Sequence, residues 1–223
     1  MERLAFEEWW QDFLAQFDRR ADPYTIIDRL RTYFRRLSDD ESADFEQGLV
    51  DVVCSRGTAW SIAEAVLEDN PRTDTCSRVA AVLREFMPSS IEDQSYEAEI
   101  VRILARCRNA SAQSLVREFL LDKPIRMYWT SVPWSVWPQY PDLFGQAYVR
   151  YFENVDLERI RGTAVIQAFF FSPEALKQIK IAMLQTDKQD LWKRLRQVVL
   201  QTRAVGVSES EISAVQQILA EDS

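Results

Sequence analysis

The chain has 223 residues, of which 47% are hydrophobic and 28% charged, a composition typical of a globular protein rather than a disordered or fibrous one. It contains no histidine, which excludes Ser-His-Asp and Cys-His catalysis and metal sites with histidine ligands. The net charge of −8 disfavours nonspecific nucleic-acid binding, and the five glycines are too far apart for a phosphate-binding loop.

The N-terminal segment is predicted to form amphipathic helices. The apolar face of the first helix holds Phe6, Trp9, Trp10, Phe13 and Phe17. Its other positions are mostly acidic, whereas a helix on a membrane surface would carry lysine and arginine there. We therefore expect residues 1–37 to form capping helices that dock on the rest of the fold, with no membrane partner.

A second helix is predicted to begin at Asp22 and Pro23. Aspartate is a favoured N-cap, and proline is tolerated in a first turn because its missing N–H has no partner there. The cations on this helix that are candidates for binding phosphate are Arg29, Arg35 and Arg36. Aspartates such as Asp28 and Asp39 lie close in sequence and are the alternative partners of these arginines.

Short amphipathic helices continue along the chain. Ser38 and Glu41 form a capping-box pattern for a helix that we expect to end at Gly57, in a left-handed cap. Apolar stripes at helical spacing then predict helices over residues 58–69, 76–86, 95–107 and 111–120. In the second half the same spacing predicts helices over residues 142–152, 156–171, 172–184, 187–205 and 208–219. Ser208 and Glu211 provide a second capping box for the last of these.

The pattern predicts an all-α fold. No segment alternates with the period of two that marks a strand, and about eleven helices are separated by short links. We expect a single domain over residues 1–223. Its architecture resembles HEAT-like or armadillo-like α-solenoids built from helix pairs, and an irregular multi-helix domain is the alternative.

The most unusual stretch is rich in aromatic residues and prolines. Its candidate partner-binding residues are Tyr128, Trp129, Trp134, Trp137 and Tyr140. Prolines keep such a segment out of regular helix, and rings on a stiff loop lose little entropy when a partner binds. The sequence therefore predicts a recognition surface here, and the alternative is that the rings fill a gap within their own domain.

Acidic residues on two predicted helices are candidates for metal chemistry, whereas the acidic stretch from Asp39 to Asp44 is explained by the start of a helix. Glu64 and Glu68 are four residues apart, and Glu97 and Glu99 follow on a later helix. Carboxylates that share a helix face hold magnesium in all-α nucleotide pyrophosphatases, which makes a Mg-dependent phosphohydrolase the alternative function. Solvated helix surface is the simpler interpretation, so we expect no metal site and no cofactor. Clustering of these carboxylates around one cavity would favour the enzyme.

The three cysteines, Cys54, Cys76 and Cys107, contain no Cys-x-x-Cys pair and lie in or beside apolar helical runs. We expect them to be reduced core residues. Acidic residues near the N-terminus do not fit a signal peptide, and no apolar run reaches the length that spans a bilayer, so a cytoplasmic protein is predicted.

No nucleophile–base pair, metal site or phosphate loop can be identified. The sequence therefore favours a non-catalytic module that binds another protein. Residues 1–100 carry 22 acidic and 11 basic side chains, which would suit either an adaptor or a protein that neutralises a basic toxin, as immunity proteins do.

Overall fold

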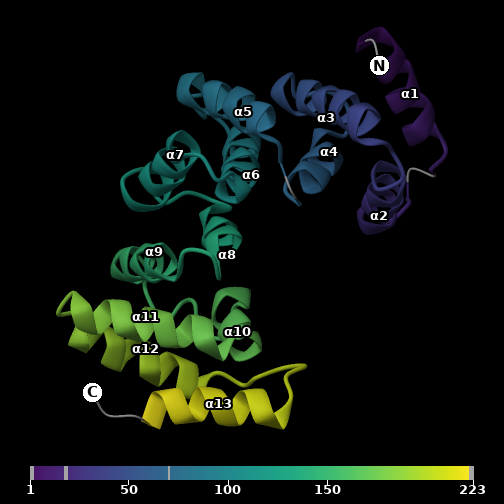
Figure 1. The fold of residues 1–223 in the computed structure, drawn as a ribbon. Coiled ribbons are helices and arrows are strands. Elements are labelled where there is room, and N and C mark those ends of the chain that lie inside the picture. Colours follow the sequence, from purple (N-terminus) through teal and green to yellow (C-terminus); the bar gives the residue numbers. More distant parts are fainter. Residues whose placement is uncertain (1–2, 18–19, 70, 221–223) are drawn as a thin grey trace. The chain divides into compact units, whose positions relative to one another are not determined.

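The computed structural model describes residues 3–17, 20–69 and 71–220, and within these ranges it contains helices and no strand (Figure 1). The all-α prediction is confirmed, although the described residues form thirteen α-helices and one 3-10 helix where about eleven helices were expected. None of these helices is long and apolar enough to span a membrane.

The elements are α1 (Arg3–Ala15), α2 (Pro23–Phe34), α3 (Asp39–Cys54), α4 (Trp60–Leu67), α5 (Thr73–Glu85), α6 (Ile91–Arg106), α7 (Ala110–Leu121), η1 (Trp129–Ser131), α8 (Val132–Val136), α9 (Pro141–Asn154), α10 (Ala164–Phe171), α11 (Pro173–Gln185), α12 (Gln189–Gln201) and α13 (Glu209–Ala220). The chain divides into two compact units, Met1–Val116 and Arg117–Ser223, with the boundary inside α7. The single domain expected from the sequence stays a prediction, and each unit is described by itself.

Helices of the first unit pack in two rows. In one row α1 contacts α3 and α3 contacts α5, and in the other α2 contacts α4 and α4 contacts α6 (Figure 1). Contacts of α3 with α4 and of α5 with α6 join the rows. The core between them includes Trp10, Phe45 and Leu49, which have at most 1% of their surface exposed. The Trp10 indole is also anchored, because its Nε1 donates to the carbonyl of Thr58 at 3.0 Å.

Two of the predicted helix starts are present as expected. The Asp22 side chain accepts a hydrogen bond from the backbone N–H of Tyr24, and Pro23 occupies the first turn of α2. Ser38 and Glu41 form the predicted capping box at the start of α3. These matches follow from local chemistry, since a cap needs only a side chain two or three residues from the N–H groups that it satisfies.

The end of α3 differs from the prediction at Gly57. The residue in the left-handed conformation is Arg56, with φ of 53°, and the Gly57 N–H donates to the carbonyl of Val52 at 2.8 Å. Arg56 is held in place by Asp93, whose Oδ1 lies 2.6 Å from Nη1, and by the ring of Tyr96, whose centroid lies 4.8 Å from the guanidinium. Contacts of the arginine side chain with α6 therefore fix the cap one residue earlier than the glycine suggested.

Helix α6 also begins earlier than expected. Its N-cap is Ser90, not Ser95, and Ser90 and Asp93 form a reciprocal capping box. Hydrogen bonds from Ser89 and from the Arg56 guanidinium hold the pKa of Asp93 well below its usual range. The start of α6 is thus tied to the end of α3 through Asp93.

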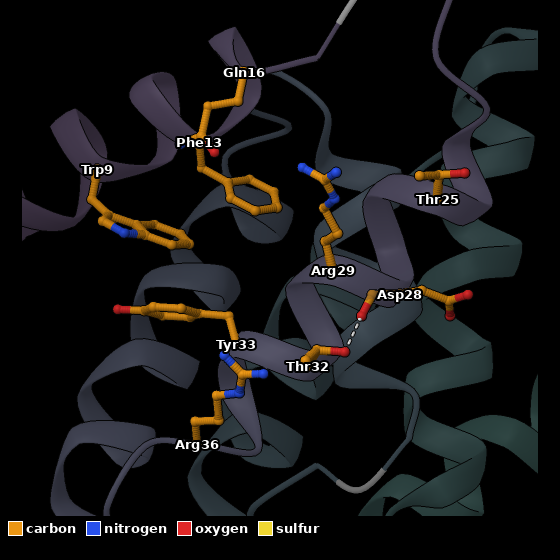
Figure 2. Close-up of a pocket in the computed structure, with 9 residues that line it drawn as sticks. All are labelled: Trp9, Phe13, Gln16, Thr25, Asp28, Arg29, Thr32, Tyr33 and Arg36. Atoms are coloured by element: carbon orange, nitrogen blue, oxygen red, sulfur yellow. Dashed lines mark hydrogen bonds between the residues drawn. The ribbon is translucent and has the colours of Figure 1, made fainter.

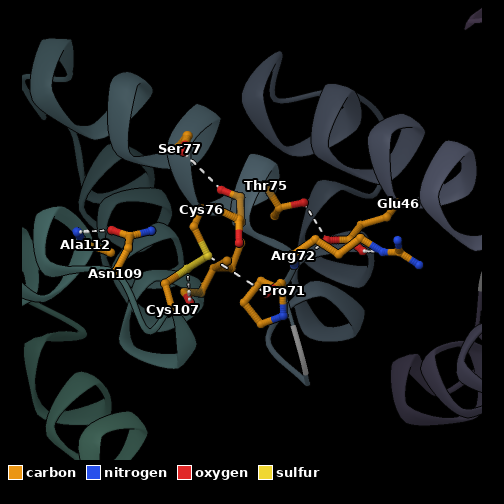
Figure 3. Close-up of a disulfide and its surroundings, with 11 residues drawn as sticks. Glu46, Pro71, Arg72, Thr75, Cys76, Ser77, Cys107, Asn109 and Ala112 are labelled. Atoms are coloured by element: carbon orange, nitrogen blue, oxygen red, sulfur yellow. Dashed lines mark hydrogen bonds and ion pairs between the residues drawn. A yellow bond between two sulfur atoms is a disulfide. The ribbon is translucent and has the colours of Figure 1, made fainter.

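The cysteine prediction is wrong for two of the three residues. Cys76 in α5 and Cys107 at the end of α6 form a disulfide, with their Cα atoms 5.8 Å apart (Figure 3). The packing of α5 against α6 brings together two residues that are 31 positions apart in sequence. Cys54 remains a free, half-buried thiol, and burial raises its pKa. Because disulfides are typical of oxidising compartments, the cytoplasmic location stays a prediction.

The second unit is organised around α9 and α11. Helix α9 packs against α8, α11 and α12, and α11 also contacts α10, α12 and α13. The approach of α9 to α11 requires Gly145, because a Cβ there would lie 2.9 Å from the Cβ of Ala182 and 3.0 Å from the Gln178 carbonyl. The helix predicted over 156–171 is only Ala164–Phe171, because residues 156–163 form turns that pass through Gly162 at φ of 73°.

Candidate functional site

The aromatic stretch of residues 128–140 folds into the second unit. It contains the 3-10 helix η1 and the short helix α8, where an irregular loop was expected. Trp129 has no exposed surface, its ring stacks on Tyr151 with centroids 5.7 Å apart, and its Nε1 donates to the carbonyl of Phe119. A ring buried in this way cannot contact a partner, so Trp129 is a core residue and not part of a recognition surface.

Neighbouring rings of this stretch are partly accessible. Trp134 and Trp137 are half-buried, and each ring centroid lies 5.1 Å from that of Phe144 in α9. Tyr128 is 43% exposed, while Tyr140 is half-buried at the N-cap of α9. Partner binding by these four residues stays a prediction, but the contacts with Phe144 show that Trp134 and Trp137 also support the fold.

A better-defined opening lies between α1 and α2 in the first unit (Figure 2). Its volume is about 570 Å³, within the range of roughly 300–1,000 Å³ that ligand sites occupy. The lining residues are Trp9, Phe13, Gln16, Thr25, Asp28, Arg29, Thr32, Tyr33 and Arg36. We call this opening the α1–α2 groove.

Aromatic rings form the apolar wall of the α1–α2 groove. Trp9 stacks on Tyr33 across the two helices with centroids 4.9 Å apart, and it also stacks on Phe13 at 5.2 Å (Figure 2). Trp9 and Phe45 of α3 meet edge to face, with ring centroids 4.9 Å apart. Trp9 is therefore fixed by rings from three helices, which makes the wall a rigid surface. Such a surface loses little side-chain entropy when a ligand binds.

Two arginines lie at this wall, Arg29 in α2 and Arg36 in the turn that follows it. In Figure 2 the guanidinium groups of Arg29 and Arg36 lie on either side of the Tyr33 ring. The Arg29 guanidinium lies 5.3 Å from the ring centroid of Phe17, a cation–π contact that leaves its charge unneutralised. Among the described residues no ion pair involves Arg29 or Arg36.

The aspartates expected to neutralise these arginines make other contacts. The Asp22 carboxylate caps α2. An oxygen of Asp28 lies 3.8 Å from Nη1 of Arg31, three residues further along α2. Asp39 lies in the first turn of α3, where a carboxylate is favoured by the helix dipole. The sequence identified these arginines as candidates for anion binding, but it did not show that the nearby carboxylates would make other contacts.

The carboxylates proposed for magnesium only partly come together. Glu64 and Glu68 of α4 and Glu99 of α6 gather around Arg102, whose Nη2 lies 2.5 Å from Glu68 Oε2. Glu97 is buried, yet it is not among the charges that act on Glu64. Within the described ranges no group of three or more acidic or cysteine residues is placed to hold a metal ion.

Glu64 is the most perturbed of these carboxyl groups. It is only 2% exposed, and its Oε1 has no hydrogen-bond partner. Burial raises the pKa of Glu64 to about 9, against the attraction of Arg102. Burial also raises the pKa of Glu99. Burial therefore holds the proton of Glu64 at neutral pH, as expected for a carboxyl group removed from water.

The α1–α2 groove thus combines an aromatic wall with two cations that form no ion pair among the described residues. Comparison with known proteins does not add a family to this picture. No family model matches the chain, and no curated protein or solved structure is significantly similar to it. The groove therefore has to be interpreted from its own chemistry.

Proposed function

We propose that the protein is a non-catalytic protein–protein interaction module, either an adaptor or a neutralising protein of the immunity type. The observation that carries this proposal is the α1–α2 groove, where the rigid pair of Trp9 and Tyr33 lies beside two arginines that form no ion pair with any described carboxylate. Aromatic and arginine side chains dominate the binding energy of protein interfaces. On a surface that only faces water, the same residue types would contribute no binding energy.

The helix arrangement of the first unit supports this proposal. Row packing of α1 with α3 and α5, and of α2 with α4 and α6, is the pattern expected of stacked helix pairs. We therefore propose a HEAT-like arrangement for this unit. Proteins built from stacked helix pairs commonly act by presenting an extended binding surface.

The proposal is tested by affinity capture from the source organism with crosslinking, followed by mass spectrometry. The wild-type chain, the double variant Arg29→Glu/Arg36→Glu and the control Arg35→Glu serve as parallel baits. Arg35 is the exposed C-cap of α2, between the two groove arginines in sequence, but it lines a different hollow with residues of α3 and α4. We expect a partner that crosslinks near α1 or α2 and is retained by the control.

The outcomes separate the function from the site. A partner that crosslinks to another surface and is retained by all three baits would keep the interaction function and reject the groove as its site. Absence of any partner with defined stoichiometry would contradict the proposed function itself. Turnover of a phosphate ester by the purified protein would contradict it as well and would favour the phosphohydrolase alternative.

A further inference from the structure

We propose that the α1–α2 groove binds an acidic peptide segment in which one large apolar side chain is flanked by two carboxylates. This inference rests on the proposed function and names the chemistry of the partner. The argument comes from the order of side chains along α2, from the carboxylates that the groove arginines lack and from the size of the opening.

Helix α2 and the turn that follows it place the groove residues in a row. Arg29 and Tyr33 are four positions apart on one face of α2, and Arg36 lies in the turn just after the helix ends at Phe34. At 1.5 Å per residue, Arg29 and Tyr33 are about 6 Å apart along the axis of α2, and Arg36 follows beyond the aromatic ring. Figure 2 shows this order, with the Arg29 and Arg36 side chains above and below Tyr33. The complementary ligand carries anion, apolar group and anion in the same order.

Other arginines of the first unit show what the groove arginines lack. The Asp69 carboxylate accepts two hydrogen bonds from Arg31, at 2.7 and 2.9 Å. Arg72 lies 3.1 Å from the buried carboxylate of Glu46. Arg29 and Arg36 have no such partner among the described residues, although their planar guanidinium groups suit two-pronged carboxylate binding. Charge complementarity therefore favours carboxylates supplied by another molecule.

The apolar part of the ligand is defined by the opposite wall. Trp9 and Phe13 of α1 face the groove and stack on each other, and the Trp9 ring also contacts Tyr33 and Phe45. A volume of about 570 Å³ accommodates a few side chains and not a folded domain. A Phe, Trp or Leu side chain of the ligand would bury its surface against these rings.

The overall charge favours a short acidic segment over a polyanion. Residues 1–100 carry twice as many acidic as basic side chains, which repels nucleic acid along its whole length. Two or three peptide carboxylates are affected mainly by charges within the screening length of about 8 Å at physiological salt. The nearest cations are then the groove arginines themselves. The carboxylate of Asp28 at the groove edge would oppose a third anion.

The test is selection of binders from a displayed library of random 12-residue peptides, with the full wild-type chain as target. We expect enrichment of sequences in which an aromatic or leucine side chain has Asp or Glu on both sides. Fluorescence anisotropy of the selected, labelled peptide then gives its affinity for each variant. Arg29→Gln and Arg36→Gln should each weaken binding about tenfold or more, whereas Arg35→Gln should change it less than about twofold.

A charge swap separates direct contact from an effect on folding. Arg29→Glu/Arg36→Glu should lose the selected peptide and should bind a version in which its carboxylates are replaced by lysine. Wild-type affinity of the double variant for the acidic peptide would overturn the proposal. Basic or uncharged consensus sequences, or no enrichment, would overturn it too. A native partner that is still captured by the double variant would leave the interaction function intact, so the two failures are distinguishable.

Discussion

Glu64 offers a sharp test of the electrostatics of the first unit, because replacing it with glutamine should stabilise the protein. The side chain is 2% exposed and Oε1 has no hydrogen-bond partner. Burial raises the pKa of Glu64 from the ordinary 4.5 to about 9. Glutamine has nearly the same shape and no ionisable proton, so Glu64→Gln removes the titration and keeps the packing.

The direction in which stability changes with pH follows from which state, folded or unfolded, binds the Glu64 proton. Between pH 4.5 and about 9 the folded protein keeps the Glu64 proton, whereas the unfolded chain releases it. The contribution of Glu64 to the free energy of unfolding is therefore fully present below pH 4.5 and is lost as the pH rises toward 9. The slope is about 1.4 kcal/mol per pH unit, which makes the loss on the order of 3 kcal/mol at pH 7.

The assay is urea unfolding of the wild type and of Glu64→Gln between pH 5 and 8. We expect the two free energies of unfolding to be close at pH 5 and the variant to gain an advantage that grows with pH. Glu85→Gln is the control, since Glu85 is exposed near the end of α5. Parallel curves for the wild type and Glu64→Gln would refute the reasoning. They would mean that Glu64 is ionised in the folded protein and neutralised by Arg102.

Three further predictions concern the core, the disulfide and metals. Trp129→Ala should lower the unfolding free energy by about 3–5 kcal/mol because the ring has no exposed surface. The same truncation of the half-buried Trp137 should cost less. Equal losses of the two variants in a denaturant melt would contradict this difference. Replacing both Cys76 and Cys107 with serine should lower the unfolding free energy by about 3–4 kcal/mol, because the bridge joins residues 31 positions apart. An unchanged urea midpoint would instead show that the thiols are reduced in the purified protein. Magnesium, manganese and zinc should leave the melting temperature unchanged in differential scanning fluorimetry, whereas a magnesium-dependent rise would favour the phosphohydrolase.

Local signals were readable from the sequence because their chemistry lies within a few residues. The caps at Asp22 and at Ser38 with Glu41 form as predicted, since each cap depends on neighbouring N–H groups alone. Apolar spacing likewise predicted the all-α fold. At Gly57 the same reasoning failed by one residue, because Arg56 is held by a carboxylate and a ring of a distant helix.

Features that depend on the packing of distant helices could not be read in this way. The bridge between Cys76 and Cys107 follows from α5 packing on α6, and an odd number of cysteines gave no sign of it. Trp129 was expected on a surface because prolines flank it, yet a proline in the first turn of α8 is compatible with helix. Trp129 itself begins η1, immediately before α8, and its ring lies in the core.

The candidate site combines both kinds of information. Each wall of the α1–α2 groove is a local pattern, Trp9 and Phe13 on one helix and Arg29, Tyr33 and Arg36 on the other helix and the turn after it. What makes it a site is a non-local fact, namely that nearby carboxylates make other contacts and that the groove cations form no ion pair within the described ranges. Both arginines are exposed in a chain that has more acidic than basic residues. That imbalance is the physical reason to seek an acidic ligand here, and the charge-swap experiment addresses it directly.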